Sequence, residues 1–425
     1  MLAINGGTPI RSKKWPSWPV WDNQTLSQLE SVLHSGRWAI SGQWKGTTSK
    51  CIEFEKKFAN FNNANYCVTT TNGSSSLLIA LESLGIGPGD EVIVPVLTWA
   101  ATAVSVCDVN ATPVFVDVDA ETYCISIDEV RKTITPRTKA IIPVHLYGCM
   151  ADMDKLIEIA KEKNISIIED TSHSHGSMWE DKYAGTIGDV GAFSFQQGKV
   201  LTSGEGGVLL TNRKDIYDNA IELRSNSRVY LDDVDLKVDK MQLVEKGSIM
   251  GTNYCLSEFQ AAILLNQLEK LEYFNRSKEE NAKYLDQNIS KIPGIKVMYR
   301  YPKVKKQSYY RYAVRVDTNY FANKQMSKIC NALEAELNTT VELPYKPLHK
   351  SPLYRPWTKK RYKWSNAHIN SLQTEGLTFP VAEKAANNEG IVIHHSVLLG
   401  ERQDMDHIIA AFEKVQKLAY TIQEK

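Results

Sequence analysis

Lys199 stands where the amine of a lysine side chain would be chemically useful. It follows a predicted strand, GAFSFQ (191–196), and precedes a Gly-rich turn and a second predicted strand, GGVLLTN (206–212). A lysine that is held on such a fixed backbone and partly shielded from water loses its proton more readily. It then becomes a nucleophile that forms Schiff bases with carbonyl compounds. The alternative is an ordinary solvated lysine in a loop beside a hairpin.

Two acidic residues end another predicted strand, within ISIIEDTSHSHG (165–176). Proteins of alternating strands and helices bind ligands at the carboxyl ends of their strands, so Asp170 is well placed to meet one. A carboxylate there suits the protonated pyridine nitrogen of pyridoxal 5′-phosphate (PLP), because the pairing keeps that ring an electron sink. The alternative is a helix cap or an ion pair at the strand end.

Two histidines, His173 and His175, follow this acidic pair. They do not make a metal site by themselves, and no third ligand stands at a suitable spacing. We therefore predict that no metal is bound, and that these imidazoles are buried or hydrogen-bonded side chains.

A third segment, TTTNGSSSLLIAL (69–81), runs from a strand end into a predicted helix. The backbone N–H groups at a helix N-terminus bind phosphate, and Gly73, Ser74 and Ser75 are placed to form such a cradle. The alternative is an ordinary serine at the helix cap. In PVLTWAAT (95–102), Trp99 is placed to stack on a flat heteroaromatic ring, or else is a structural tryptophan.

The elements that must position these residues alternate between strand and helix. The predicted strands are rich in β-branched residues, and their ranges are 91–96, 112–118, 139–147 and 165–171. The predicted helices between them span 74–85, 98–109 and 153–163. Strands that are apolar throughout and alternate with helices predict a mostly parallel sheet that is buried on both faces, in an α/β protein.

A long amphipathic helix is predicted over 256–290. We expect it to join a large domain, residues 1–290 with an N-terminal arm, to a smaller C-terminal α+β lobe, residues 291–425. A chain of 425 residues is longer than one compact core usually organises, which favours two lobes.

Charge and composition exclude several classes of partner. The chain has 50 Lys and Arg against 49 Asp and Glu, so neither nucleic acid nor a membrane surface is indicated. The first residues lack the apolar run of a signal peptide, and no segment is apolar enough to span a bilayer. Seven scattered cysteines without CxxC pairs favour a reducing, cytoplasmic location.

Together these motifs resemble the DegT/StrS family of sugar aminotransferases. The family pattern is a phosphate-binding turn, an aromatic ring stacker, an Asp after a strand, and then Ser-x4-Lys followed by Thr-x-Gly-Glu-Gly-Gly. The matching residues here are Asn72 to Ser75, Trp99, Asp170, Ser194 to Lys199, and Thr202 to Gly207. The resemblance implies a fold-type I PLP-dependent transferase, with a large lobe around a sheet of the seven-stranded type and a smaller C-terminal lobe.

The resemblance also implies a role for each matching residue. Lys199 would carry PLP and move the proton, and Asp170 would pair with the pyridine nitrogen. The remaining cofactor contacts would come from Gly73, Ser74, Ser75 and Ser194 at the phosphate, Trp99 on the ring face, and His173 at the ring hydroxyl, where many members carry Gln. Asn253, in GTNY, would reach the phosphate of the neighbouring subunit, which implies a homodimer with shared active sites.

Within the family, several segments resemble the members that aminate keto-cyclitols in aminoglycoside biosynthesis. They include YKPLHKSPLYRPWTKKRY (345–362) and IVIHHSVLL (391–399). The implied reaction moves an amino group from L-glutamine or L-glutamate to a keto-cyclitol such as 2-deoxy-scyllo-inosose. The alternatives are a nucleotide-linked keto-sugar as acceptor, or a PLP-binding regulatory protein of the same fold. A sugar dehydratase of this fold would carry His in place of Lys199.

Overall fold

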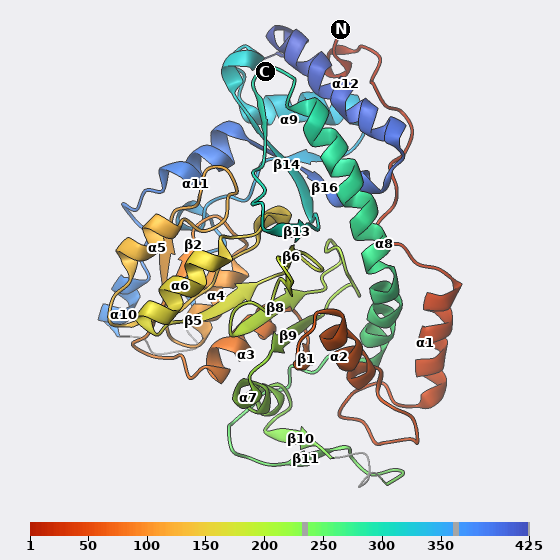
Figure 1. Ribbon diagram of the computed structural model, residues 1–425, viewed down its shortest axis with the longest axis vertical. Helices are drawn as coiled ribbons and strands as arrows, with labels where there is room; N and C mark the ends of the chain where they lie inside the picture. The colour runs from red at the N-terminus through yellow and green to blue at the C-terminus, as the bar shows by residue number, and fades with distance from the viewer. Residues whose placement is uncertain (232–236, 360–364, 424–425) are drawn as a thin grey trace.

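The computed structural model describes residues 1–231, 237–359 and 365–423. At its centre is a seven-stranded sheet in the order β1-β9-β8-β5-β4-β2-β3 (Figure 1). These strands are β1 (Tyr66–Thr70), β2 (Glu91–Pro95), β3 (Thr112–Val116), β4 (Thr138–Ile141), β5 (Ser166–Asp170), β8 (Val190–Ser194) and β9 (Gly207–Thr211). From β8 across to β3 the pairs are parallel, whereas β9 is antiparallel to both β8 and β1. The predicted α/β fold with a mostly parallel sheet is confirmed.

The strands are apolar along their length because helices cover both faces of the sheet. Along β9, Leu209 packs into one hydrophobic cluster, whereas its neighbours Val208 and Leu210 pack into another on the opposite face. The helices that surround the sheet are α1 (Asn23–Ser35), α2 (Lys50–Phe61), α3 (Gly73–Ser83), α4 (Ala101–Asp108), α5 (Ile127–Thr133), α6 (Met153–Lys163) and α7 (Lys214–Arg224).

One predicted strand is shorter than expected. The apolar run 139–147 forms β4 only as far as Ile141. Pro143 has no N–H to give to a ladder, and its carbonyl instead accepts a hydrogen bond from the backbone N–H of Asp170. The chain then turns through a short 3-10 helix, Leu146–Gly148, which brings Tyr147 toward the second lobe.

The helix α8 (Glu258–Ile289) confirms the long helix predicted from the sequence, and it runs from the large sheet up to a second sheet (Figure 1). That second sheet is antiparallel, in the order β12-β14-β16-β15. Its strands are β12 (Ile295–Val297), β14 (Arg311–Val316), β15 (Val341–Glu342) and β16 (Gly390–His394), and the helices around it are α9 (Met326–Leu337) and α12 (Arg402–Leu418).

The two sheets have separate hydrophobic clusters. The cluster of the four-stranded sheet includes Leu2, whereas Leu348 and Tyr354 pack into the cluster of the large sheet. The N-terminal end and the segment around 348–354 therefore cross between the lobes, and the division into 1–290 and 291–425 stays a proposal. Among the described residues, no helix has the length and apolarity to cross a membrane.

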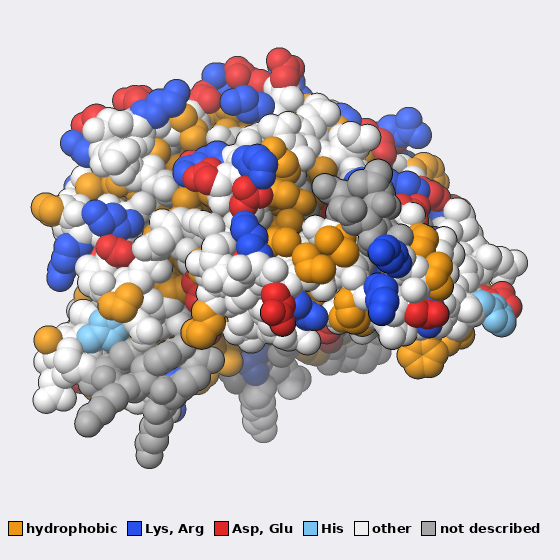
Figure 2. Space-filling view, turned by 90° about the horizontal axis from the view of Figure 1, so that it is seen from below, with side chains coloured by type: hydrophobic (Ala, Val, Ile, Leu, Met, Phe, Trp, Pro, Cys, Tyr) orange, Lys and Arg blue, Asp and Glu red, His pale blue; other side chains and the backbone are white. Residues whose placement is uncertain are grey.

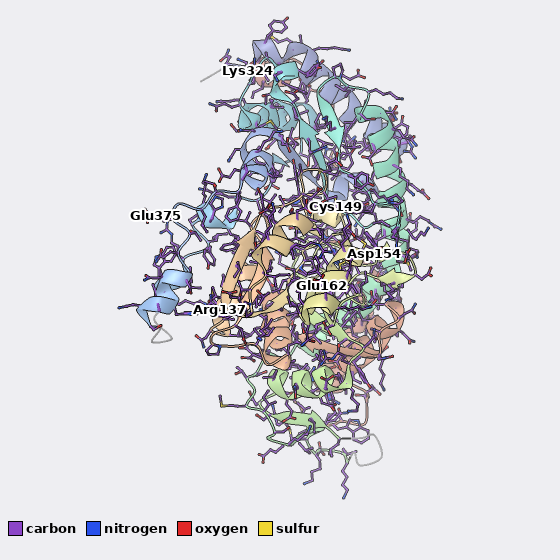
Figure 3. All side chains as sticks on the ribbon, turned by 60° about the vertical axis from the view of Figure 1, so that its left-hand side comes forward. Arg137, Cys149, Asp154, Glu162, Lys324 and Glu375 are labelled. Atoms are coloured by element: carbon purple, nitrogen blue, oxygen red, sulfur yellow. The ribbon has the colours of Figure 1, made fainter. Side chains whose placement is uncertain are left out.

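Smaller elements connect the two lobes. A three-stranded sheet joins β13 (Val304–Lys306) to β6 (Met178–Trp179) and β7 (Lys182–Tyr183). Beside it, Asp154 of α6 accepts a 3.0 Å hydrogen bond from Trp179 Nε1 and pairs with Lys303 at 2.5 Å (Figure 3). The remaining described elements are β10 (Arg228–Tyr230), β11 (Leu243–Glu245), α10 (Asn366–Ser371) and α11 (Pro380–Lys384).

Candidate active site

Lys199 is a buried residue and not the solvated loop lysine of the alternative interpretation. It is 8% exposed and lines a cavity of about 810 Å³ between the two sheets. Burial lowers the pKa of its amine to about 7, although the carboxylate of Asp170 opposes this shift. A large fraction of the amine is therefore neutral near neutral pH, which makes it a nucleophile and a base.

The loop between β8 and β9 holds the backbone of Lys199. The N–H of Lys199 donates to the carbonyl of Gln196 at 2.8 Å, and the N–H of Gln197 donates to the carbonyl of Gly204 at 2.8 Å. Gly204 has a φ of +87°, in the left-handed region that favours glycine, so this turn requires the Gly-rich sequence that follows the lysine.

Asp170 reaches the same cavity from the end of β5. Its Oδ2 accepts a 2.9 Å hydrogen bond from the hydroxyl of Thr102, and its Oδ1 accepts one of 3.2 Å from the N–H of Ser172. Both bonds fix the orientation of the carboxyl group. An oriented carboxyl group thus lines the same cavity as Lys199.

The neighbouring Glu169 has a different role. It is fully buried and accepts hydrogen bonds from the N–H groups of Gly185, Ile187 and Gly188 at 2.7–2.8 Å. Its Oε2 also lies 3.0 Å from Nε2 of His145. Because successive side chains of a strand point to opposite faces, Glu169 serves the fold while Asp170 faces the cavity.

The predicted phosphate cradle is partly assembled on one chain. Gly73 and Ser74, at the start of α3, line the cavity together with Ser194. A Cβ at Gly73 would lie 2.7 Å from Cβ of Ser194, so only glycine allows α3 to approach β8 this closely. Ser75 does not line the cavity; its hydroxyl caps the helix by accepting from the N–H of Asn72 at 3.2 Å.

Trp99 and His173, the two predicted ring contacts, both line the cavity. Trp99 is 52% exposed, and its ring centre lies 5.7 Å from that of Tyr345. His173 is buried and stacks on Tyr310 with ring centres 4.0 Å apart. Burial, aided by the charge of Lys199, lowers the pKa of His173 well below its usual value. Its Nδ1 accepts from the N–H of Tyr147, so Nε2 of the neutral ring carries the hydrogen.

His175 has different hydrogen-bond partners from His173. Its Nε2 lies 3.0 Å from the carbonyl oxygen of Ser194, and burial lowers its pKa to about 3. Within the part of the chain that the structure describes, no three His, Cys, Asp or Glu side chains form a metal-binding group.

Four residues that sequence reasoning did not assign to the site line the cavity from the second lobe. They are Tyr310, Arg311, Glu342 and Tyr345. Nη2 of Arg311 pairs with Oε2 of Glu342 at 3.2 Å. Besides Lys199, Arg311 is the one positively charged side chain among the described residues of this lining. No local motif marks these residues, which come from β14, β15 and the segments next to them.

Asn253 does not line the cavity of its own chain. It is exposed, and its Oδ1 accepts a 3.1 Å hydrogen bond from the N–H of Cys255. Met250, close to it in the sequence, is 92% exposed. Figure 2, which views the molecule from the end that carries β10 and β11, shows further hydrophobic side chains exposed among charged ones.

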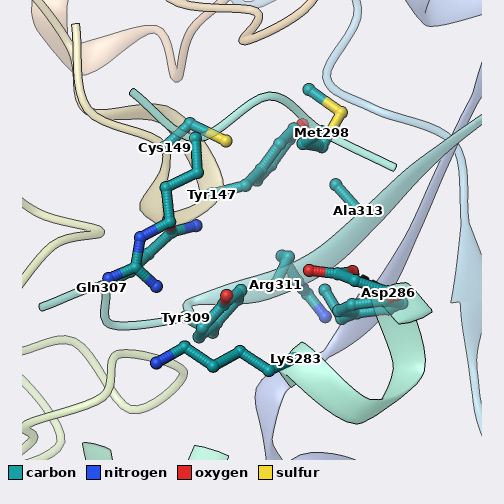
Figure 4. Close-up of a pocket in the computed structure, with 11 residues that line it drawn as sticks. Tyr147, Cys149, Lys283, Asp286, Met298, Gln307, Tyr309, Arg311 and Ala313 are labelled. Atoms are coloured by element: carbon teal, nitrogen blue, oxygen red, sulfur yellow. Dashed lines mark hydrogen bonds between the residues drawn. The ribbon is translucent and has the colours of Figure 1, made fainter. Parts of the chain in front are cut away.

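A smaller cavity of about 230 Å³ adjoins the site and shares Arg311 with it (Figure 4). Asp286 of α8 lies at its edge, where burial raises the pKa of the carboxyl group to about 6 although Tyr312 donates to it at 2.8 Å. Arg311 therefore separates two hollows at the junction of the lobes.

Comparison with known proteins identifies relatives that match along nearly the whole chain. The L-glutamine:2-deoxy-scyllo-inosose aminotransferase of Micromonospora echinospora is 44% identical over 416 residues, covering 98% of this chain and 97% of that protein. The L-glutamine:scyllo-inosose aminotransferase of Streptomyces griseus is 39% identical over 415 residues, or 97% of each chain.

Solved structures also match nearly the whole chain. The 3-amino-5-hydroxybenzoic acid synthase has a TM-score of 0.79 and 27% identity, covering 95% of this chain and 99% of that one. DesV of S. venezuelae, solved with a ketimine intermediate, has a TM-score of 0.77 and 28% identity over the same shares.

The fold and the buried lysine thus define the class of PLP-dependent aminotransferases. More narrowly, the chain belongs to the DegT/DnrJ/EryC1/StrS aminotransferase family, which matches residues 22–409. The family and the enzyme class predicted from the sequence are confirmed.

Proposed function

We propose that this enzyme transfers the amino group of L-glutamine to a keto-cyclitol such as 2-deoxy-scyllo-inosose, in aminoglycoside biosynthesis. The observation that carries the proposal is identity of 38–44% to aminotransferases that are named for L-glutamine and an inosose, over at least 97% of this chain. The cytoplasm is the proposed compartment, which the seven free cysteines support.

The cavity suits PLP by the chemistry of its donors. A buried amine with a lowered pKa, a fixed carboxylate, a helix N-terminus with serine hydroxyls and an indole ring all line one space. We propose that Lys199 holds the aldehyde carbon, Asp170 the pyridine nitrogen, and Ser74, Ser194 and the N–H groups of α3 the phosphate. Trp99 and His173 would contact the ring. When bound, the cofactor supplies an electron sink for the carbon that loses its proton.

The protein's own groups then divide the remaining tasks. Asp170, oriented by Thr102 and Ser172, would favour a proton on the nitrogen that faces it. Lys199 would offer a neutral Nζ in the cavity, a base able to accept the proton of the donor's α-carbon and to give it up again. The second half of the reaction uses the same groups in reverse.

Arg311 is the proposed anchor for the α-carboxylate of the donor. Its guanidinium carbon lies 5.2 Å from the centre of the Tyr310 ring, and Nζ of Lys199 lies 4.2 Å from the centre of the same ring. A donor whose amine replaces that of Lys199 brings its carboxylate into reach of this guanidinium, which binds carboxylates with two parallel hydrogen bonds. Glu342 pairs with Arg311 and must yield to the donor.

The proposal includes an isologous homodimer with shared active sites. Asn253 is exposed and outside its own cavity, and Met250, close to it in the sequence, is exposed as well. In a dimer that covers this face, Asn253 would complete the phosphate cradle of the partner's site.

A half-reaction assay tests the function. The enzyme loaded with PLP is mixed with L-glutamine or L-glutamate, and the loss of visible absorbance is followed. Absorbance should then return fastest with 2-deoxy-scyllo-inosose. A higher kcat/KM with a nucleotide-linked keto-sugar would reject the keto-cyclitol as acceptor, and no turnover with any ketone would favour a regulatory protein.

A further inference from the structure

Ring N–H groups from distant segments form hydrogen bonds with the turn that carries Lys199. Nε1 of Trp18 donates to the carbonyl oxygen of Lys199 at 3.1 Å and to that of Gln197 at 3.2 Å. Nε2 of His395 lies 3.2 Å from the carbonyl oxygen of Gly198. Three consecutive carbonyl groups of the turn therefore accept bonds from rings that do not line the cavity.

His395 has one tautomer that fits this arrangement. It is fully buried, and burial lowers its pKa well below the usual value, so the ring is neutral. Its Nδ1 has no hydrogen-bond partner within the described residues, which leaves the hydrogen on Nε2, toward Gly198. The paired His394-His395 of the sequence therefore supports the lysine turn, and neither histidine lines the cavity of about 810 Å³.

Three side chains pack around the indole of Trp18. Its ring centre lies 4.6 Å from that of His395 and 5.9 Å from that of Phe274, and Nζ of Lys278 lies 4.8 Å from it. Lys278 is fully buried, and its amine has no hydrogen-bond partner within the described residues. These neighbours pack around the indole while its Nε1 points toward the carbonyl of Lys199.

The arm that carries Trp18 is fastened to both lobes. On the side of the second lobe, the buried Arg11 pairs with Asp404, and Nε1 of Trp15 donates to the carbonyl of Leu337 at 2.7 Å. On the side of the large lobe, Gln267 donates to the carbonyl of Val20 at 2.6 Å. Figure 1 shows this arm as the red trace that descends from α12 past α8 to α1.

We infer that Trp18 is a positioning residue for Lys199, and that its indole N–H fixes the backbone from which the lysine amine moves. The inference rests on the proposed role of Lys199. That amine must serve two positions, the cofactor carbon and the donor's α-carbon, and a small displacement of such a group lowers the rate strongly. Trp18 acts on the backbone and touches neither substrate nor cofactor.

The test compares Trp18→Phe with a matched control, Trp15→Phe. Each variant loses one indole N–H of the same arm that bonds to a backbone carbonyl, and each keeps an aromatic ring. We expect similar losses in Tm for both. Only Trp18→Phe should lower the single-turnover rate with L-glutamine, on the order of tenfold, with little change in KM. It should also shift the pH midpoint of the visible absorbance of PLP on Lys199.

A second variant keeps the inference falsifiable if Trp18→Phe does not fold. His395→Phe removes the other ring donor to the turn, and the same spectral shift and rate loss should follow. Equal rates and equal spectral midpoints in Trp15→Phe, Trp18→Phe and His395→Phe would overturn the inference. None of these measurements uses a ketone, so a wrong acceptor would leave their outcome intact. A parent enzyme that bound PLP elsewhere than on Lys199 would instead reject the proposed function.

Discussion

The amine of Lys199 lies 4.2 Å from the centre of the Tyr310 ring, so a residue of the large lobe and a residue at the start of β14 meet across the cavity. The same ring stacks on His173. The reactive amine is therefore enclosed by both lobes, and its burial follows from their contact. The burial that results from this contact lowers the pKa of Lys199.

The first prediction concerns pH. Burial lowers the pKa of Lys199 to about 7, from an ordinary value of 10.5. The neutral amine attacks the aldehyde of PLP, so the rate at which cofactor-free enzyme recombines with PLP should rise as the pH increases through about 7 and then level off. An exposed lysine would keep gaining rate above pH 9. Stopped-flow absorbance measures this profile, and a midpoint near the ordinary value would contradict it.

Lys199→Ala should abolish turnover while PLP still binds non-covalently, because the proposed phosphate and ring contacts survive. The expected loss is at least about 100-fold, since the variant lacks the group that moves the proton. Equilibrium dialysis measures retained PLP, and steady-state assays measure activity. Substantial activity without added amine would show that another group does this work.

Asp170→Asn should slow the glutamine half-reaction on the order of 100-fold or more, because a neutral amide does not hold the pyridine proton. PLP should remain bound. The control is Glu169→Gln, which changes the carboxylate on the other face of β5 and should chiefly lower the Tm by weakening its bonds to backbone N–H groups. A single-turnover rate for Asp170→Asn equal to that of the parent would exclude Asp170 as the ring partner.

Arg311→Gln should separate the two substrates. A lost charge-assisted hydrogen bond costs about 1.5–3 kcal/mol, so KM for L-glutamine should rise roughly 10- to 100-fold. The reverse half-reaction with the aminated cyclitol, which has no carboxylate, should keep its rate. Arg315→Gln is the control, because Arg315 is on the same strand but bonds to the carbonyl of Ala120 and does not line this cavity. Equal losses with both amines would assign Arg311 a structural role.

The shared site is tested by mixing chains. In co-expressed Lys199→Ala and Asn253→Leu subunits, random pairing makes about half of the dimers mixed. Each mixed dimer would hold one site with both defects and one with neither, so activity should return to about a quarter of the parental value. Two different tags purify the mixed species. Confirmed heterodimers without regained activity would place Asn253 in the site of its own chain.

Much of the candidate site could be predicted from local sequence, because several of its residues lie in short segments with recognisable patterns. β-branched runs between helices define strands, and a carboxylate or lysine at a strand end must lie at the edge where parallel strands end. Asp170, Ser194 and Lys199 therefore come together from the order of elements alone. A Gly-rich turn marks Lys199 for the same reason, since Gly204 needs a backbone conformation that other residues rarely adopt.

The rest depended on how distant segments pack. Arg311 and Trp18 reach the surroundings of Lys199 from β14 and from the N-terminal arm, and nothing in their local sequence specifies which surface those segments will meet. Ser75 carries the same chemistry as Ser74, yet the helix cap uses its hydroxyl and leaves Ser74 at the cavity. Sequence by itself thus determined the residue types and the α/β fold, although β4 ends at Ile141, before the predicted end. The tertiary structure alone decided the burial that lowers the pKa of Lys199, because desolvation is a property of all the atoms around an amine.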